Sequence, residues 1–527
     1  MIKEIFNIRD TEVKSVGVVG AGPGGLVTAI LLASHGVPTT LYEAADRVGG
    51  RCSTIESDGF KFDRGPTYFL MPFVLDEILA TSGRKLSEEI DLHELEPMYR
   101  LDIGHEGRRF KIDATRDLDR MEAQFDEICP GDGKAFRKFY DINNAKIQAF
   151  EPVLRHPLNN AKDMLKPKFI PGGLRLDPLH SMKTATGKHF QHPVNEIAVS
   201  FQSKYLGMSP WDAPSLFTIL NFIEYGFGVW HPRGGCGGLM QELARVFEEL
   251  GGTIVLNQPI TGLRFDGRTC RGVELGDDHR VCEHEHVVIN ADAAWAIRNL
   301  IPKHLQGTWN DRKVETADYS CSTMMMYVGV EGDIDLSHHT VRISENYVEN
   351  LQDISRGNGA GGTISLDPSF YVCNPSRIDD SMAPPGHSSL YVLVPVPNTK
   401  SGIDWSTARP QVRDMVLKTL RDQMNVDLEG RIVTELHHTP DTWADTNIHF
   451  GAAFSLSHTL RQMAIFRPKH RWPTCDGLWM VGGGTHPGSG LPVIFLGAMA
   501  TARDVLGELG VECRMPNGTP VGELVGT

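Results

Sequence analysis

Hydrophobic positions near the N-terminus form two short runs with glycines between them. Residues 15–19 are uncharged and mostly apolar, glycines follow at positions 20, 22, 24 and 25, and an uncharged segment continues to residue 34. A second apolar run ends in Leu41-Tyr42-Glu43. This order predicts a buried strand, a tight turn, a helix and a second strand that ends at an acidic residue.

A membrane span or a secretory signal would also lack charge over such a length. Five glycines and Pro23 interrupt the continuous helix that a span needs, and no small-residue cleavage site follows an apolar core. The pattern therefore favours the strand–turn–helix unit.

Similar patterns recur later in the chain. Residues 59–67 predict a strand that enters a turn, and residues 68–225 are mixed but mostly helical by pattern. Further strands are expected at 253–257, 261–265, 270–275, 286–292, 322–330, 389–395 and 477–481, and helices at about 239–250, 408–425 and 493–509.

The nucleotide-binding pattern occupies three separate parts of the chain. We therefore expect an α/β fold with a discontinuous Rossmann-like domain made of residues 1–80, 226–309 and 470–510. An inserted mixed α+β domain, made of residues 81–225 and 310–469, would bind the substrate. Residues 511–527 form a C-terminal tail.

Composition narrows the class of protein. The chain has 527 residues and a net charge of -14, which disfavours nucleic acid as a partner. Its nine cysteines are an odd number and form no CxxC, which predicts free thiols in a reducing compartment and no metal site. The pairs His338-His339 and His437-His438 are interpreted as solvated or structural, since adjacent strand residues face opposite ways.

Residues 155–188 depart from the acidic average. This segment has seven basic residues against two acidic ones, with leucines and other apolar residues between them. It fits a contact with an anionic bilayer surface, or an ordinary exposed loop and helix with solvated bases.

The first glycine turn has the spacing of a dinucleotide site. Gly20 allows the tight turn, Gly22 lets the backbone approach a pyrophosphate, and Gly25 lets the helix pack closely on the strand. Glu43 lies 18 residues after Gly25, where it can accept hydrogen bonds from a ribose. The sequence therefore predicts that the chain binds a dinucleotide.

A second glycine-rich turn, residues 482–490, lies between a predicted strand and a predicted helix near the C-terminus. A helix N-terminus directed at a flavin ring would stabilise the negative charge of the reduced flavin. The alternative is a turn whose glycines serve packing only.

Motifs along nearly the whole chain resemble those of phytoene desaturases of the bacterial and fungal type, within the amine-oxidase-like flavoproteins. Besides the two glycine turns, they include Gly49-Gly50-Arg51, residues 62–67, residues 228–235, Asn290-Ala291-Asp292, residues 451–455 and Phe466-Arg467-Pro468. The C-terminal motif is the most specific to that family. Arg64 departs from it, since the family often has alanine there.

The resemblance implies FAD as the cofactor, and it implies which residues bind it. The pyrophosphate would lie on the first glycine turn, the adenosine at Glu43 and Ile260, and the flavin near residues 65–67 and the C-terminal turn. The implied cofactor-binding residues are Gly20, Ala21, Gly22, Pro23, Gly24, Gly25, Glu43, Ala44, Gly50, Arg51, Gly65, Pro66, Thr67, Ile260, Gly484, Thr485, Pro487, Gly488, Leu491, Pro492 and Val493.

The resemblance also implies an oxidoreductase that acts on CH–CH bonds of phytoene, a lipophilic polyene. Alternatives are a thirty-carbon dehydrosqualene desaturase, a carotene isomerase, or a lipid-binding carrier on the same fold. Oxygen or a quinone would accept the electrons, and the cytoplasmic enzyme would touch the membrane through residues 155–188. Glu224 is the candidate catalytic base, with a structural hydrogen bond as the alternative.

Overall fold

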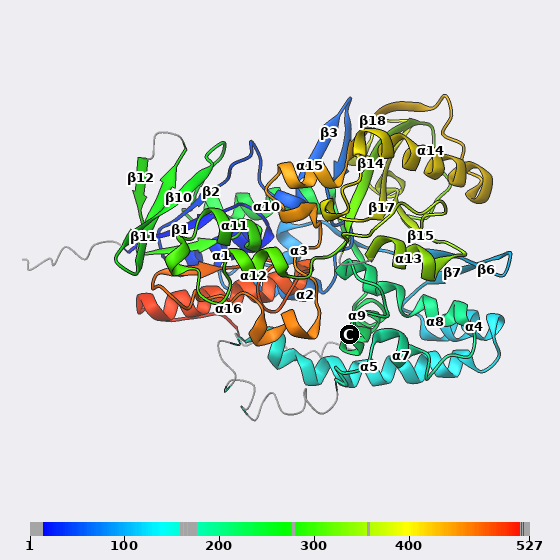
Figure 1. Cartoon of the computed structure of the whole chain (residues 1–527), viewed down its shortest axis with the longest axis horizontal. Coiled ribbons are helices and arrows are strands. Elements are labelled where there is room, and N and C mark those ends of the chain that lie inside the picture. Colours follow the sequence, from blue (N-terminus) through cyan, green and yellow to red (C-terminus); the bar gives the residue numbers. More distant parts are fainter. Residues whose placement is uncertain are drawn as a thin grey trace, which may run out of the picture.

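The computed structural model describes residues 14–156, 158, 162, 166, 176–276, 280–355, 359–516, 518 and 520. One of the two large sheets is a five-stranded parallel sheet with the order β19-β13-β1-β2-β9. The strands are β1 (Val16–Val19), β2 (Thr39–Tyr42), β9 (Thr253–Val255), β13 (His286–Ile289) and β19 (Leu478–Met480). Three distant parts of the chain therefore build one sheet (Figure 1).

Three helices lie side by side against this sheet, with α1 in contact with both others. They are α1 (Pro23–Ser34), α10 (Gly235–Glu249) and α16 (Leu491–Leu509). Most of α1 is buried, so the uncharged N-terminal segment is a core helix. Among the described residues, no helix has the length and apolar character needed to cross a bilayer.

The remaining sheets are antiparallel or mixed. One antiparallel sheet packs against β13 and consists of β10 (Ile260–Asp266), β11 (Thr269–Leu275) and β12 (Arg280–Glu283). A seven-stranded sheet has the order β18-β14-β17-β16-β15-β6-β7. Its strands are β6 (Tyr99–His105), β7 (Arg108–Ala114), β14 (Ser322–Glu331), β15 (His339–Ile343), β16 (Phe370–Cys373), β17 (His387–Val396) and β18 (Ile432–His438).

The hairpin β6–β7 corrects the expectation that residues 68–225 are mostly helical. Its two strands pair in register from Tyr99 with Ala114 to His105 with Arg108. It joins the seven-stranded sheet because β6 pairs in parallel with β15, more than 230 residues later. That partner cannot be read from the local pattern.

Helices cover this second unit on several sides. Helix α14 (Trp405–Met424) buries Val412, Val416 and Leu420 against Met324, Met326 and Val328 of β14. The other α-helices of the described residues, which belong to one unit or the other, are α2 (Pro72–Ala80), α3 (Leu86–Glu89), α4 (Leu118–Ile128), α5 (Asp132–Arg155), α7 (Met182–Thr186), α8 (Pro193–Ala198), α9 (Ile219–Phe227), α11 (Ala293–Asn299), α12 (Asp311–Thr316), α13 (Tyr347–Ser355) and α15 (Pro440–Asp445). Two short ribbons pair β3 (Thr54–Ser57) with β4 (Phe60–Asp63) and β5 (Leu92–Glu94) with β8 (Trp230–Pro232).

The result is an α/β fold with a discontinuous Rossmann-like unit and an inserted mixed α+β unit. In Figure 1 the Rossmann-like unit lies on the left, and the seven-stranded sheet and helices α4, α5 and α7–α9 lie on the right. All nine cysteines are described, and their thiols are free.

Candidate functional site

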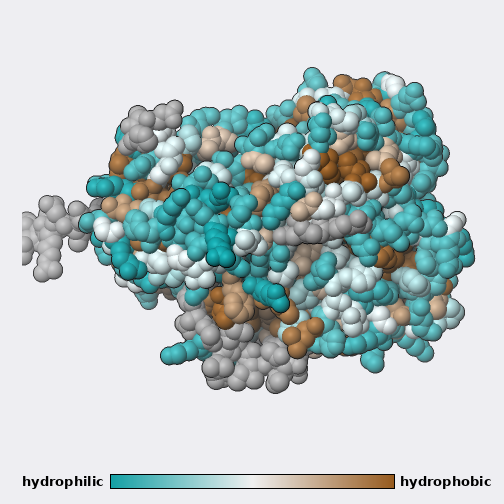
Figure 2. All heavy atoms as spheres, in the orientation of Figure 1, coloured by the Kyte–Doolittle hydropathy of each residue, from teal (hydrophilic) through white to brown (hydrophobic). Residues whose placement is uncertain are grey.

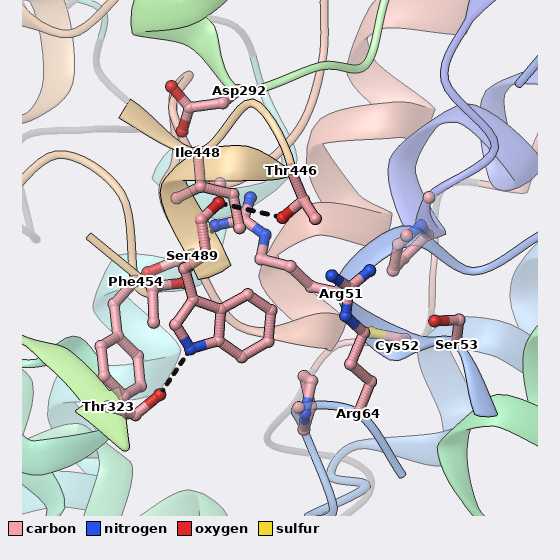
Figure 3. A pocket seen from close by; sticks show the side chains of 18 of the residues that line it. Arg51, Cys52, Ser53, Arg64, Asp292, Thr323, Thr446, Ile448, Phe454 and Ser489 are labelled. Atoms are coloured by element: carbon pink, nitrogen blue, oxygen red, sulfur yellow. Dashed lines mark hydrogen bonds between the residues drawn. The ribbon is translucent and has the colours of Figure 1, made fainter. Parts of the chain in front are cut away.

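A cavity of about 1360 Å³ lies where the two units meet. This volume exceeds the roughly 300–1,000 Å³ of an ordinary ligand pocket, so there is room for a dinucleotide and a second ligand. Its lining combines the glycine turns and polar side chains with many apolar residues, most of them from the inserted unit. Figure 3 shows the polar side, with residues from both units directed into the same space.

The first glycine turn forms one wall. Helix α1 begins after Gly22, and no side chain caps its first N–H groups, which leaves them available to an anion. Gly20, Gly22, Pro23 and Gly24 line the cavity. Gly25 lies beneath this wall, where an added Cβ would stand 2.1 Å from the Gly20 carbonyl oxygen.

Glu43 is held in place by the backbone around it. Its carboxylate accepts hydrogen bonds from the Ala21 N–H at 2.7 Å and the Ala45 N–H at 2.9 Å. A carboxylate accepts more than two hydrogen bonds, so lone pairs remain for the hydroxyls of a ribose. Ala44 and Ile260 line the cavity beside it.

Two guanidinium groups face the same space. Arg51 donates to the Ala453 carbonyl oxygen at 3.0 Å, and Arg64 lies over the Trp443 ring, 5.1 Å from its centroid. Figure 3 draws both arginines on one side of the cavity. The Arg64 Nε has no hydrogen-bond partner among the described residues, and burial lowers the pKa of this side chain. An unpaired buried donor in this position fits an anionic ligand.

Gly50, Gly65, Pro66 and Thr67 also line the cavity. Three tyrosines of the seven-stranded sheet hold the loop that contains them. The Tyr327 hydroxyl donates to the Arg64 carbonyl and the Tyr391 hydroxyl to the Gly65 carbonyl, both at 2.6 Å, and the Tyr371 hydroxyl lies 2.8 Å from the Thr67 Oγ1. The inserted unit thus positions a loop of the Rossmann-like unit.

The C-terminal glycine turn divides into two parts. Leu491, Pro492 and Val493 line the cavity at the N-terminus of α16, where Gly490 is the N-cap residue and no side chain caps the helix. Six of the residues implied as cofactor-binding do not line the cavity: Ala21, Gly25, Gly484, Thr485, Pro487 and Gly488. Close packing explains Gly484, whose added Cβ would stand 2.5 Å from the Ala293 Cβ.

Arg467 organises this turn, a role that the sequence did not indicate. Its guanidinium is 1% exposed and donates to five carbonyl oxygens, those of Leu456, Ser457, Gln462, Gly483 and Thr485. Burial lowers its pKa to about 9. The only sequence signal was its place in the motif Phe466-Arg467-Pro468.

His338 and His339 are buried, which overturns the solvated interpretation of this pair. The His338 Nδ1 lies 3.3 Å from the His339 Nδ1 and 3.9 Å from the Cys373 Sγ. The His339 Nδ1 also lies 2.5 Å from the Tyr371 hydroxyl. Burial lowers the pKa of both histidines, so they are neutral and support the Tyr371 side of the cavity.

Glu224 is fully buried on α9 and does not line the cavity. Its Oε2 accepts hydrogen bonds from the Tyr99 hydroxyl at 2.8 Å and the Gln202 Nε2 at 3.0 Å. Burial raises its pKa to about 7. The Tyr68 and Tyr205 side chains line the cavity, and the charge of Glu224 raises the pKa of both after burial, so they lie near this carboxyl group.

The basic segment 155–188 is described only in part, because 157, 159–161, 163–165 and 167–175 lie outside the described residues. Arg155 pairs with Glu77 and Glu151, and Lys183 with Glu196. Leu179 is 86% exposed. The described part thus combines an exposed leucine with two bases, Arg155 and Lys183, that already have acidic partners.

Comparison with known proteins gives the chain its family. The model of the family described as flavin containing amine oxidoreductase matches residues 23–506. A 4,4'-diapophytoene desaturase (4,4'-diapolycopene-forming) from Methylomonas is 37% identical over 494 residues, covering 93% of this chain and 94% of the relative. A phytoene desaturase (lycopene-forming) from Pantoea ananas is 34% identical over 500 residues, covering 94% and 100%.

Solved structures support the fold. An oxidoreductase from Methanosarcina mazei superposes with a TM-score of 0.61 at 17% identity, covering 93% of this chain and all of that one. A putrescine oxidase variant superposes with a TM-score of 0.60 at 18% identity, covering 94% and 99%.

The residues on the cavity wall fit the cofactor of this family. Unpaired helix N–H groups and the free Arg64 Nε suit a pyrophosphate, and the oriented Glu43 carboxylate suits a ribose. The cofactor is FAD. The protein is thus a member of the flavin-containing amine oxidoreductase family and, within it, of the carotenoid desaturases, oxidoreductases that act on CH–CH bonds.

Proposed function

We propose that the protein removes hydrogen from carbon–carbon single bonds of phytoene and so extends its conjugated system. The observation that carries this proposal is the single cavity shared by the nucleotide wall and an apolar chamber. The chamber is lined by Leu70, Phe201, Leu206, Met208, Leu220, Ile223, Met325, Val341, Leu351, Ile354, Phe370 and Leu393. Such a lining suits a long hydrocarbon next to a flavin.

No side chain can accept hydride from an unactivated carbon, and bound FAD supplies that acceptor. The protein's own residues orient the polyene, keep water out of the apolar chamber, and receive the proton lost from the neighbouring carbon. The hydride itself carries away one proton and two electrons. The neighbouring carbon loses a second proton separately, and a double bond remains between the two carbons.

We propose Glu224 as the group that takes up this second proton, through the tyrosines in front of it. Burial and then the charge of Glu224 raise the pKa of both Tyr68 and Tyr205, which places their rings within its field. The hydroxyls of both tyrosines lack a hydrogen-bond partner among the described residues. A tyrosine hydroxyl can accept the proton from the substrate while it donates its own toward Glu224.

Replacing Glu224 with glutamine is expected to lower kcat about 100-fold. The wild-type kcat should rise with pH around 7, because the carboxylate must be ionised to accept a proton and its pKa is about 7. The variant should lose this rise, since glutamine does not titrate. Steady-state rates between pH 5.5 and 8.5 measure both effects.

Tyr205→Phe should lower kcat as well, whereas Tyr140→Phe serves as the control, because Tyr140 packs on Phe222 away from the cavity. A Glu224→Gln enzyme that is slower but keeps the wild-type pH profile would assign Glu224 a structural role only.

The length of the substrate is a second question. The relative from Methylomonas, at 37% identity, is named for a diapophytoene substrate, which favours a thirty-carbon polyene as the second candidate. Purified protein with FAD, liposomes and oxygen or a quinone should be incubated with an equimolar mixture of phytoene and 4,4'-diapophytoene. Chromatography with mass detection should show polyenes that have lost two hydrogens per step.

Products that differ from the substrate in geometry but not in mass would replace this proposal with an isomerase. A protein that binds the polyene without FAD and returns it unchanged would be a carrier.

Residues 155–188 are proposed to bring the cytoplasmic enzyme to an anionic membrane surface. The exposed Leu179 supports this contact, and Figure 2 shows further hydrophobic side chains at the lower surface of the molecule. We also propose the domain division 1–80, 226–309 and 470–510 against 81–225 and 310–469, which the origins of the two large sheets support, with β6 and β7 grouped in the second domain.

A further inference from the structure

One charged side chain lines the apolar chamber of the cavity. Lys204 belongs to a short 3-10 helix, Phe201–Leu206, and it lines the cavity together with Leu351 and Ile354 of α13 and Phe370 of β16. Its Nζ lies 5.0 Å from the centroid of the Tyr347 ring. Lys204 therefore brings a charged side chain to the wall of the space proposed for a hydrocarbon.

Lys204 has no acidic partner among the described residues. A neighbouring cation, Arg342, shows the usual arrangement, since it pairs with Asp367 at 2.5 Å and donates to Gln423 at 2.8 Å. No described carboxylate or carbonyl makes such a contact with the Lys204 Nζ. Burial is the main cause that lowers the pKa of Lys204 to about 7.

An unpaired ammonium in apolar surroundings destabilises the protein, and a methionine or leucine at this position would avoid that cost. A ligand made only of carbon and hydrogen gives the charge nothing to bind. A ligand with an anionic end would supply the missing partner and would be held by a charge-assisted hydrogen bond inside the cavity.

We propose that Lys204 is a subsite for a terminal carboxylate on the polyene. This inference rests on the proposed function and extends its substrate class from a plain hydrocarbon to an acyclic polyene that carries a carboxylate at one end. With the carboxylate held at Lys204, the chain extends along the apolar wall toward the loop that contains Thr67. A fixed end sets which carbon–carbon bond of the chain lies beside the flavin.

Equilibrium binding to the FAD-loaded protein tests the subsite without relying on turnover. All-trans-retinoic acid and all-trans-retinol serve as probes, because they share one polyene and differ at its end. Quenching of tryptophan fluorescence at pH 6.5 gives the two dissociation constants. We expect the acid to bind about tenfold more tightly than the alcohol, as a charge-assisted hydrogen bond contributes more than a neutral one.

Lys204→Met should remove the preference for the acid, and Lys204→Arg should keep it. Lys400→Met is the matched control, because Lys400 also lies over aromatic rings, those of Tyr319 and Phe450, but does not line the cavity. That variant should keep the wild-type preference. Wild-type protein without the preference, or a Lys204→Met protein that retains it, would overturn the proposal.

Failure of the proposed function has a different signature. If the wild-type protein desaturates neither phytoene nor 4,4'-diapophytoene but still prefers the acid through Lys204, the subsite stands and the hydrocarbon substrates are wrong. If both hydrocarbons are desaturated and no acid preference exists, the desaturase stands and the subsite is rejected.

Discussion

Replacing Gly25 with alanine is expected to leave the purified protein almost free of FAD. The added Cβ would stand 2.1 Å from the Gly20 carbonyl oxygen and 3.0 Å from the Asn290 Nδ2, and the first of these is backbone that cannot move aside. Helix α1 must shift, and its N-terminus then no longer meets the pyrophosphate. Affinity for FAD should fall roughly 100-fold, the upper part of the range for overpacking a tight site.

The flavin absorbance per mole of protein after gel filtration measures this loss. Gly507→Ala is the matched control, because Gly507 lies in helix α16 and an added Cβ there meets nothing within 4 Å. That variant should keep its flavin. Normal flavin content in the Gly25→Ala protein would show that the turn tolerates the shift and that α1 does not position the pyrophosphate.

Arg467→Met is expected to destabilise the protein by about 3–5 kcal/mol, the range for breaking a buried charged network. Five carbonyl oxygens would lose their donor in a place that water does not reach, and the turn at residues 482–490 would lose its support. Because the N-terminus of α16 follows this turn, flavin should also be released at a lower temperature. Thermal unfolding followed by flavin fluorescence measures both changes.

Arg461→Ala is the control, since Arg461 lies six residues earlier and is exposed. Its unfolding temperature should match that of the wild type. If Arg467→Met unfolds at the wild-type temperature, the five hydrogen bonds contribute nothing net and the turn is held by packing alone.

Local patterns in the sequence were sufficient for the Rossmann-like unit. Its strands are short and apolar, and glycines lie beside β1 and β19, so β1, β13 and β19 lie within the predicted ranges. The hairpin β6–β7 was missed because its place in the seven-stranded sheet depends on pairing with β15, far away in the chain. Periodicity within a window carries no information about such a partner.

The candidate site shows the same limit. A motif identifies Glu43 and Gly22 because the side chain of the first and the backbone of the second would contact the cofactor directly. A motif does not show that Leu491 lies on the cavity wall whereas the Thr485 carbonyl accepts a hydrogen bond from Arg467. The roles inferred for Arg64 and Lys204 depend on burial and on the lack of a hydrogen-bonding or acidic partner. Both are properties of the assembled fold.

The order of strands in the parallel sheet has a consequence for synthesis on the ribosome. Strand β19 completes the sheet and helix α16 packs against α1, and both emerge after the other described strands and helices of the sheet. Until then the cavity lacks the part of its wall formed by Leu491 and Pro492. A nascent chain stalled before residue 478 should therefore depend on chaperones, and FAD added during translation should protect from proteases only a chain that already includes α16.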